Sequence, residues 1–234
     1  MNREPATLAE RHAALRARID AAARRFDRDP ASIRLLAVTK GQPWTAIRDA
    51  RVLGQRAFGE NYLQEAQRKI QALAGADVEW HFIGPLQANK TRQVAAQFAW
   101  IHSLDRERVA RRLSEQRDPA LGPLQACIEV NVSGEASKSG VAPADLPALA
   151  AQVAALPGLA LRGLMAMPAP GGDFQSQRAG FAVLARLFED LRARGLGLDT
   201  LSMGTSQDLE AAIAEGATIV RVGTALFGPR RADG

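Results

Sequence analysis

A lysine and an arginine stand in this sequence where a buried charge could do chemistry. Lys40 ends the apolar run 35–40, and Arg221 lies inside a second apolar run near the other end of the chain. Burial disfavours the charged form of an amine and lowers its pKa, so a desolvated Lys40 would be a nucleophile able to form a Schiff base. A strand-end lysine that reaches solvent is an equally good interpretation of this residue taken alone.

Two short segments near the end of the chain could hold a phosphate. Gly204 and Ser206 follow one apolar run, and Gly223 and Thr224 follow the next. Glycine allows close approach of the backbone, and backbone N–H groups with small hydroxyls are typical phosphate ligands. Ser206 could also be a helix N-cap, a role that is compatible with phosphate binding.

Arg221 lies two residues before Gly223, so both are on the same face of a strand. A buried guanidinium needs an acceptor, either a structural carboxylate or an electron-rich ring nitrogen. Lysine, phosphate site and arginine together match pyridoxal 5′-phosphate (PLP), with Lys40 at the aldehyde and Arg221 at the pyridine nitrogen. A cation there keeps the nitrogen unprotonated and the ring a weak electron sink. The combination favours cofactor binding or limited proton-transfer chemistry.

These residues need a fold that brings the two ends of the chain together. Eight apolar or β-branched runs alternate with helical patterns, at 33–40, 57–60, 79–84, 99–104, 124–132, 159–167, 198–204 and 218–223. Their starts recur every 20 to 39 residues, as expected of βα units in a parallel sheet. The pattern predicts an α/β fold, a single (β/α)8 TIM-type barrel, whose site lies at the carboxyl ends of the strands.

An additional amphipathic N-terminal helix is expected over about 5–27, before a barrel over about 33–228, in one domain over 1–234. The lone Cys127 excludes a disulfide framework and a thiolate zinc site, and we expect no metal. The sequence has a net charge of +5, but its basic residues are spread along the whole chain and form no cluster. This distribution disfavours nucleic-acid binding. No apolar stretch reaches the ~18–20 residues of a membrane span. We expect a cytoplasmic monomer.

Several blocks of the sequence resemble one family. The run 80–90, Trp-His-Phe-Ile-Gly-Pro-Leu-Gln-Ala-Asn-Lys, is similar to a signature of the pyridoxal phosphate homeostasis proteins, as are the blocks at 58–62, 131–140, 202–213 and 221–228. The resemblance implies a barrel like the N-terminal domain of alanine racemase, with PLP bound through Lys40. It also implies a role in vitamin B6 and amino-acid homeostasis, with no established catalysis.

The resemblance implies further residues around the cofactor: Asn61, Met203, Ser206, Arg221, Gly223 and Thr224. His81 could also face the ring, or be a core histidine whose hydrogen bonds are satisfied. Lys138 could receive or release the cofactor, or be an exposed loop lysine. Lys69 and Lys90 fall in helical patterns and are expected to be solvated.

Four positions depart from the family pattern. Gly41-Gln42 replaces a common Thr-Lys pair, which removes a second lysine near Lys40. Thr205 stands where Met is usual, and Gln207 where an acid is usual. We expect none of these positions to touch the inferred cofactor contacts.

Three functions share these residues: a cofactor carrier or regulator, a weak PLP-dependent racemase, and a Schiff-base aldolase acting on a sugar phosphate. A racemase needs two bases, and related racemases take the second, a tyrosine, from a C-terminal domain. This sequence ends eleven residues after Gly223, and its one tyrosine is Tyr62, so we expect no second base. An aldolase leaves Arg221 unexplained. A carrier or regulator is favoured, with PLP-dependent apoenzymes as candidate partners.

Overall fold

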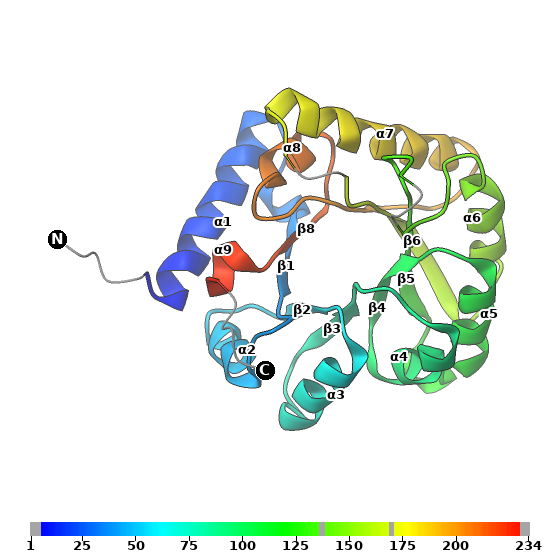
Figure 1. The fold of residues 1–234 in the computed structure, drawn as a ribbon, viewed down its shortest axis with the longest axis horizontal. Helices are drawn as coiled ribbons and strands as arrows, with labels where there is room; N and C mark the ends of the chain where they lie inside the picture. Colours follow the sequence, from blue (N-terminus) through cyan, green and yellow to red (C-terminus); the bar gives the residue numbers. More distant parts are fainter. Residues whose placement is uncertain (1–5, 136–138, 169–170, 230–234) are drawn as a thin grey trace.

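The computed structural model describes residues 6–135, 139–168 and 171–229. A closed barrel of eight parallel strands forms its centre (Figure 1). The strands pair in chain order and β8 pairs with β1. They are β1 Arg34–Val38, β2 Ala57–Glu60, β3 Glu79–Phe82, β4 Trp100–Leu104, β5 Leu124–Glu129, β6 Leu159–Met165, β7 Thr200–Ser202 and β8 Ile219–Val222. The predicted (β/α)8 barrel is confirmed, and each predicted run contains one strand.

Helices surround the barrel and cover its outer face (Figure 1). They are α1 Leu8–Arg25, α2 Trp44–Val52, α3 Leu63–Ala72, α4 Thr91–Gln97, α5 Glu107–Gln116, α6 Leu146–Ala154, α7 Phe174–Ala193, α8 Leu209–Ala214 and α9 Thr224–Phe227, with short 3-10 helices at η1 Pro30–Ser32, η2 Ala88–Lys90 and η3 Pro119–Leu121. The main hydrophobic core lies between these helices and the strands. None of the helices in the described part of the chain combines the length and apolar composition that a membrane span requires.

The additional N-terminal helix is present as α1 and is shorter than expected. Thr7 and Glu10 form a capping box, in which each side chain accepts the other residue's backbone N–H, so the helix begins at Leu8. Asp27 has a φ of 53°, which is outside the helical region. The helix therefore ends at Arg25, two residues before the predicted end at about residue 27. Helix α1 packs against α8 and α9 beside the closure of the barrel (Figure 1).

The interior of the barrel is part apolar and part polar. Leu36, Ile83 and Ile219 belong to one interior apolar cluster, and Cys127 and Met165 belong to another. Fully buried histidine and serine side chains on β3, β4 and β7 occupy the same interior. The barrel therefore encloses a hydrogen-bonding core beneath its carboxyl-terminal rim, and that core supports the site described below.

Cys127 should be inert to thiol reagents in the folded protein. It is fully buried, and burial raises the pKa of its thiol to about 12, so almost no reactive thiolate forms near neutral pH. A disulfide reagent at about pH 8, below the usual thiol pKa of about 8.5, should label no thiol in the native protein and one per chain in denaturant. Equal labelling rates in the two conditions would contradict this placement.

Candidate functional site

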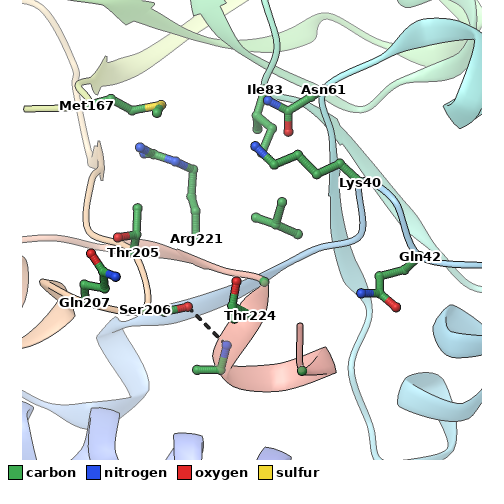
Figure 2. A pocket seen from close by; sticks show the side chains of 14 residues that line it. Lys40, Gln42, Asn61, Ile83, Met167, Thr205, Ser206, Gln207, Arg221 and Thr224 are labelled. Atoms are coloured by element: carbon green, nitrogen blue, oxygen red, sulfur yellow. Dashed lines mark hydrogen bonds between the residues drawn. The ribbon is translucent and has the colours of Figure 1, made fainter. Parts of the chain in front are cut away.

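A cavity of about 440 Å³ opens at the carboxyl ends of the strands (Figure 2). Its volume lies in the usual range for small-molecule sites. The lining comes from β1 and the turn after it, from the ends of β2, β3 and β6, and from β7–α8 and β8–α9: Val38, Lys40, Gln42, Asn61, Ile83, Met167, Thr205, Ser206, Gln207, Arg221, Gly223, Thr224, Ala225 and Gly228. A parallel barrel places all of these ends on one rim.

Lys40 lines the cavity from the turn that follows β1. Strand β1 ends at Val38, two residues earlier than the predicted run, because Thr39 accepts the Gln42 N–H at 3.0 Å and starts the turn. Lys40 is half-buried there, so the interpretation as a lysine that merely reaches solvent is not supported. Figure 2 shows Lys40 and Asn61 entering the cavity across from the segment 205–207.

Asn61 carries an unused hydrogen-bonding group at this rim. It follows β2 directly, and its Oδ1 atom is buried with no hydrogen-bond partner among the described protein atoms. A buried amide oxygen without a donor is costly. Because Asn61 lines the cavity, a ligand carrying a hydroxyl or N–H group could satisfy that oxygen.

Arg221 projects from β8 into the barrel and is only 4% exposed. Its guanidinium donates to the carbonyl and hydroxyl of Ser202 and, at 3.1 Å, to the Ala166 carbonyl. Burial lowers the pKa of Arg221 to about 10. No carboxylate of the described chain forms an ion pair with it, although the charges of Glu129 and Asp208 attract it from a greater distance. Arg221 presents a buried cation to the cavity.

A chain of hydrogen bonds runs from Arg221 down through the barrel. Arg221 lies 2.9 Å from Ser202 Oγ, which lies 2.7 Å from His102 Nδ1. His102 Nε2 lies 2.9 Å from His81 Nδ1, and His81 Nε2 lies 2.5 Å from Glu79 Oε1. The ring of His81 also stacks on that of Trp100 at 5.4 Å.

The two ends of this chain determine its proton positions. Arginine can only donate and an ionised carboxylate can only accept, so every donor in the chain must point toward Glu79. Both histidines then carry their proton on Nε2 and are neutral. Burial lowers the pKa of His81 and lowers that of His102 further. Burial alone would raise the pKa of Glu79, but the hydrogen bond from His81 and the hydrogen bond and charge of Arg34 outweigh burial and lower that pKa.

The loops after β7 and β8 are joined by a hydroxyl. Ser206 Oγ accepts the backbone N–H of Ala225 at 3.2 Å. Asp208, not Ser206, precedes α8, so the N-cap interpretation of Ser206 is wrong. Gly204 has a φ of +90°, and a Cβ there would lie 2.5 Å from that of Ala212. The turn that presents the segment 205–207 to the cavity therefore requires glycine.

Helix α1 holds the same segment from outside. Arg18 donates to the Ser206 carbonyl at 2.8 Å and forms a two-bond ion pair with Glu210 on α8. Both side chains are about one-third exposed. The N-terminal helix is thus tied to a loop that lines the site.

The structure brings six predicted site residues to one cavity: Lys40, Asn61, Ser206, Arg221, Gly223 and Thr224. His81 and Met203 are not among its lining residues. His81 has both ring nitrogens bonded to protein side chains, which is the core alternative left open above. Met203 is fully buried and packs into the main hydrophobic core. Lys138 lies outside the described residues.

Three of the residues that depart from the family pattern, Gln42, Thr205 and Gln207, also line the cavity. Two further lining residues, Ile83 and Met167, had no polar signal that could mark them. Their positions near the carboxyl ends of the predicted runs 79–84 and 159–167 were the only available sign. In the described ranges, no group of three or more metal-binding side chains occurs.

Comparisons with known proteins show what this chain is similar to. The family described as alanine racemase, N-terminal domain, matches residues 11–231. The pyridoxal phosphate homeostasis protein of Pseudomonas aeruginosa is 59% identical over 224 residues, covering 96% of each chain. That of Escherichia coli K12 is 51% identical, covering 95% of this chain and 97% of the other. The chain belongs to the pyridoxal phosphate homeostasis protein family. The resemblance noted from the sequence is confirmed.

Solved structures place this family member in the same fold. PipY of Synechococcus elongatus, solved with PLP bound, is 39% identical, with a TM-score of 0.83 over 95% of this chain and all of that one. Alanine racemase of Corynebacterium glutamicum is 17% identical, with a TM-score of 0.68, and this chain covers 62% of it. The second likeness concerns the fold alone.

His81 and His102 should be neutral in the folded protein and protonated on Nε2. Nitrogen-15 NMR of the imidazole rings should show this tautomer unchanged from about pH 8 to about pH 6, across the usual histidine pKa of about 6.5. The unfolded chain binds protons in this range and the folded chain does not. The free energy of unfolding should therefore fall as the pH drops below about 6.5. Either ring titrating at or above its usual pKa would contradict the chain.

Proposed function

We propose that this protein binds PLP through a Schiff base to Lys40. The observation that carries the proposal is the convergence in one cavity of an amine, a buried cation and two loops that offer backbone N–H groups and hydroxyls. In this arrangement Ser206 and Thr224 bind the phosphate, and Arg221 donates to the ring nitrogen. The PLP-bound structure of PipY, a 39% identical relative, supports the assignment.

The residues present fit this cofactor. The cavity is large enough for a small aromatic phosphate. The unpartnered Asn61 Oδ1 needs a donor, and a ring hydroxyl can supply one. At Gly223 an added Cβ would lie 3.1 Å from the Val38 carbonyl oxygen, so glycine allows the end of β8 to approach β1 closely at the edge of the cavity. When bound, PLP supplies an aldehyde for amines and an electron-withdrawing ring.

We infer a carrier or regulator of PLP in vitamin B6 and amino-acid homeostasis, acting as one cytoplasmic, monomeric domain on PLP-dependent apoenzymes. The names of the relatives support the homeostatic role. A racemase reaction needs a second base opposite the lysine. Tyr62, the candidate for that role, is 60% exposed and does not line the cavity. The Arg221 cation further weakens the ring as an electron sink.

The linkage to Lys40 can be tested directly. Purified protein mixed with PLP should absorb near ~420 nm, the region expected for a protonated Schiff base, and borohydride should fix the added mass on the peptide containing Lys40. Lys40→Ala should abolish both signals. Lys90→Ala, on η2 away from the cavity, is the matched control and should retain both. No absorbance change on adding PLP to the wild-type protein would refute the proposal.

The role of Arg221 can be tested through proton exchange. In deuterium oxide the wild-type protein should exchange the α-proton of L-alanine at well below ~1 per second, an ordinary enzymatic rate. Arg221→Glu should raise the pKa of the ring nitrogen and increase that exchange by about tenfold or more. Arg221→Gln keeps a donor without a charge and should increase it less.

Two results would count against these assignments. Wild-type turnover above ~1 per second would replace the carrier with an enzyme. Unchanged absorbance and exchange in both Arg221 variants, with PLP still bound at Lys40, would show that the guanidinium does not contact the ring nitrogen.

A further inference from the structure

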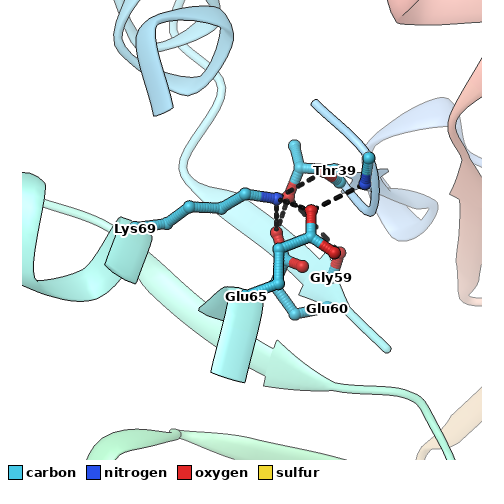
Figure 3. A network of polar contacts seen from close by, with 6 residues as sticks. Thr39, Gly59, Glu60, Glu65 and Lys69 are labelled. Atoms are coloured by element: carbon cyan, nitrogen blue, oxygen red, sulfur yellow. Dashed lines mark hydrogen bonds and ion pairs between the residues drawn. The ribbon is translucent and has the colours of Figure 1, made fainter. Parts of the chain in front are cut away.

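Lys69 was expected to be solvated, and the structure shows it buried. It lies on α3 with its side chain only 6% exposed. Its Nζ atom lies 2.6 Å from the Thr39 carbonyl, 2.7 Å from Glu60 Oε1 and 2.6 Å from Glu65 Oε1 (Figure 3). An ammonium has three N–H donors, and these three acceptors use all of them.

The two carboxylates extend this network to the turn that carries Lys40. Glu65 Oε1 also accepts the backbone N–H of Gly41 at 2.6 Å. Glu60 Oε1 also accepts the hydroxyl of Thr39. We call Lys69, Glu60 and Glu65 the lysine clamp (Figure 3).

The clamp holds the peptide groups on both sides of Lys40. The Thr39 carbonyl belongs to the peptide before Lys40, and the Gly41 N–H belongs to the peptide after it. The orientations of these two planes set φ and ψ of the residue between them. Fixing both planes therefore fixes the direction in which the Cα–Cβ bond of Lys40 leaves the backbone.

The local backbone makes that direction dependent on the clamp. Gly41 has a φ of +71°, in the left-handed region that favours glycine. Glycine also has the most backbone freedom to lose, so a turn built on it needs external contacts to stay in one conformation. The Gly41 N–H donates to Glu65, and Lys69 donates to the Thr39 carbonyl; these two hydrogen bonds supply such contacts.

The burial of these charges is not explained by stability alone. Glu60 is fully buried, and its Oε2 atom has no hydrogen-bond partner in the described chain. Burial raises the pKa of Glu60, against the attraction of Lys69. For such a pair the desolvation penalty can equal or exceed the Coulomb attraction, so buried ion pairs are weak evidence for stability. Conformational specificity is the better account here, and the conformation specified is that of Lys40.

We propose that the lysine clamp positions Lys40 for attack on an aldehyde in the cavity. The three residues touch no ligand and act through the backbone of the turn. The inference rests on the proposed Schiff base at Lys40, and it adds that the rate of linkage depends on a second, buried lysine. Pre-positioning the amine leaves less conformational entropy to be lost when the bond forms.

The test separates covalent linkage from occupancy of the cavity. The rate at which the ~420 nm band appears after mixing with PLP measures formation of the Schiff base. The Kd of pyridoxine 5′-phosphate, an analogue that lacks the aldehyde, measures non-covalent occupancy of the cavity. Lys69→Met should slow linkage about tenfold or more and change the analogue's Kd less than about twofold. Arg111→Met should change neither, because it removes an exposed i,i+4 ion pair, with Glu107, of the same spacing as Lys69 and Glu65.

A second pair of variants keeps the test decisive if Lys69→Met does not fold. Glu65 is 30% exposed and tolerates replacement better than the buried lysine. Glu65→Ala removes the acceptor of the Gly41 N–H and should slow linkage. Glu65→Gln keeps an acceptor oxygen and should restore most of the rate.

Each outcome is informative. Linkage at the wild-type rate in both Lys69→Met and Glu65→Ala would overturn the clamp while leaving the Schiff base intact. A parallel loss of analogue binding would also overturn it, because it would indicate a general structural role. If the wild-type protein binds the analogue but forms no ~420 nm band with PLP, the proposed function fails first, and the inference falls with it.

Discussion

Closure of eight parallel strands is the constraint on which the site depends. Because all strands run in the same direction, every carboxyl end lies on one rim of the barrel. Pairing of β1 with β8 then places the turn after Val38 beside the loop after Val222, although these segments lie near opposite ends of the chain. An amine, a guanidinium and two glycine-containing loops meet at this seam.

A buried cation at the rim imposes a second requirement on the interior. Arg221 forms no ion pair within the described chain and is satisfied by neutral oxygen atoms of Ser202 and Ala166. Ser202 must then act as acceptor toward Arg221 and as donor toward His102, and the same logic continues to Glu79 near the other end of the barrel. The charge that ends the chain is therefore a carboxylate far from the cavity, and Arg221 keeps its positive charge facing the ligand space.

Most of the architecture could be predicted from the sequence. The runs of β-branched and apolar residues located all eight strands, and the errors are confined to their ends. At Lys40 the predicted strand was too long because the turn from Thr39 to Gln42 depends on hydrogen bonds that the hydrophobic pattern does not report. Lys40 was singled out because a charged group at the end of a strand is unusual, and Asn61 and Arg221 lie in the blocks that carry the family resemblance.

The residues that were misjudged share a physical cause. Lys69 has the helical spacing of a solvated lysine, and its burial depends on carboxylates that come from β2 and from the previous turn of α3. His81 is in a family block, yet its ring is used by Glu79 and His102 below the cavity. Contacts that form only when strands and helices pack together decide both cases, and the hydrophobic pattern of the sequence does not report them.

By itself the sequence determined the order of strands and helices and the barrel, and it supplied the proposal that Lys40 is the reactive amine. These follow from hydrophobic periodicity and from local residue chemistry, which act over a few residues of the chain. The tertiary structure alone decided which polar groups are buried together, which ring nitrogen of each histidine carries the proton, and how the backbone around Lys40 is held. Those properties are set by burial and by hydrogen bonds between strands and helices, and they exist only once the barrel has closed.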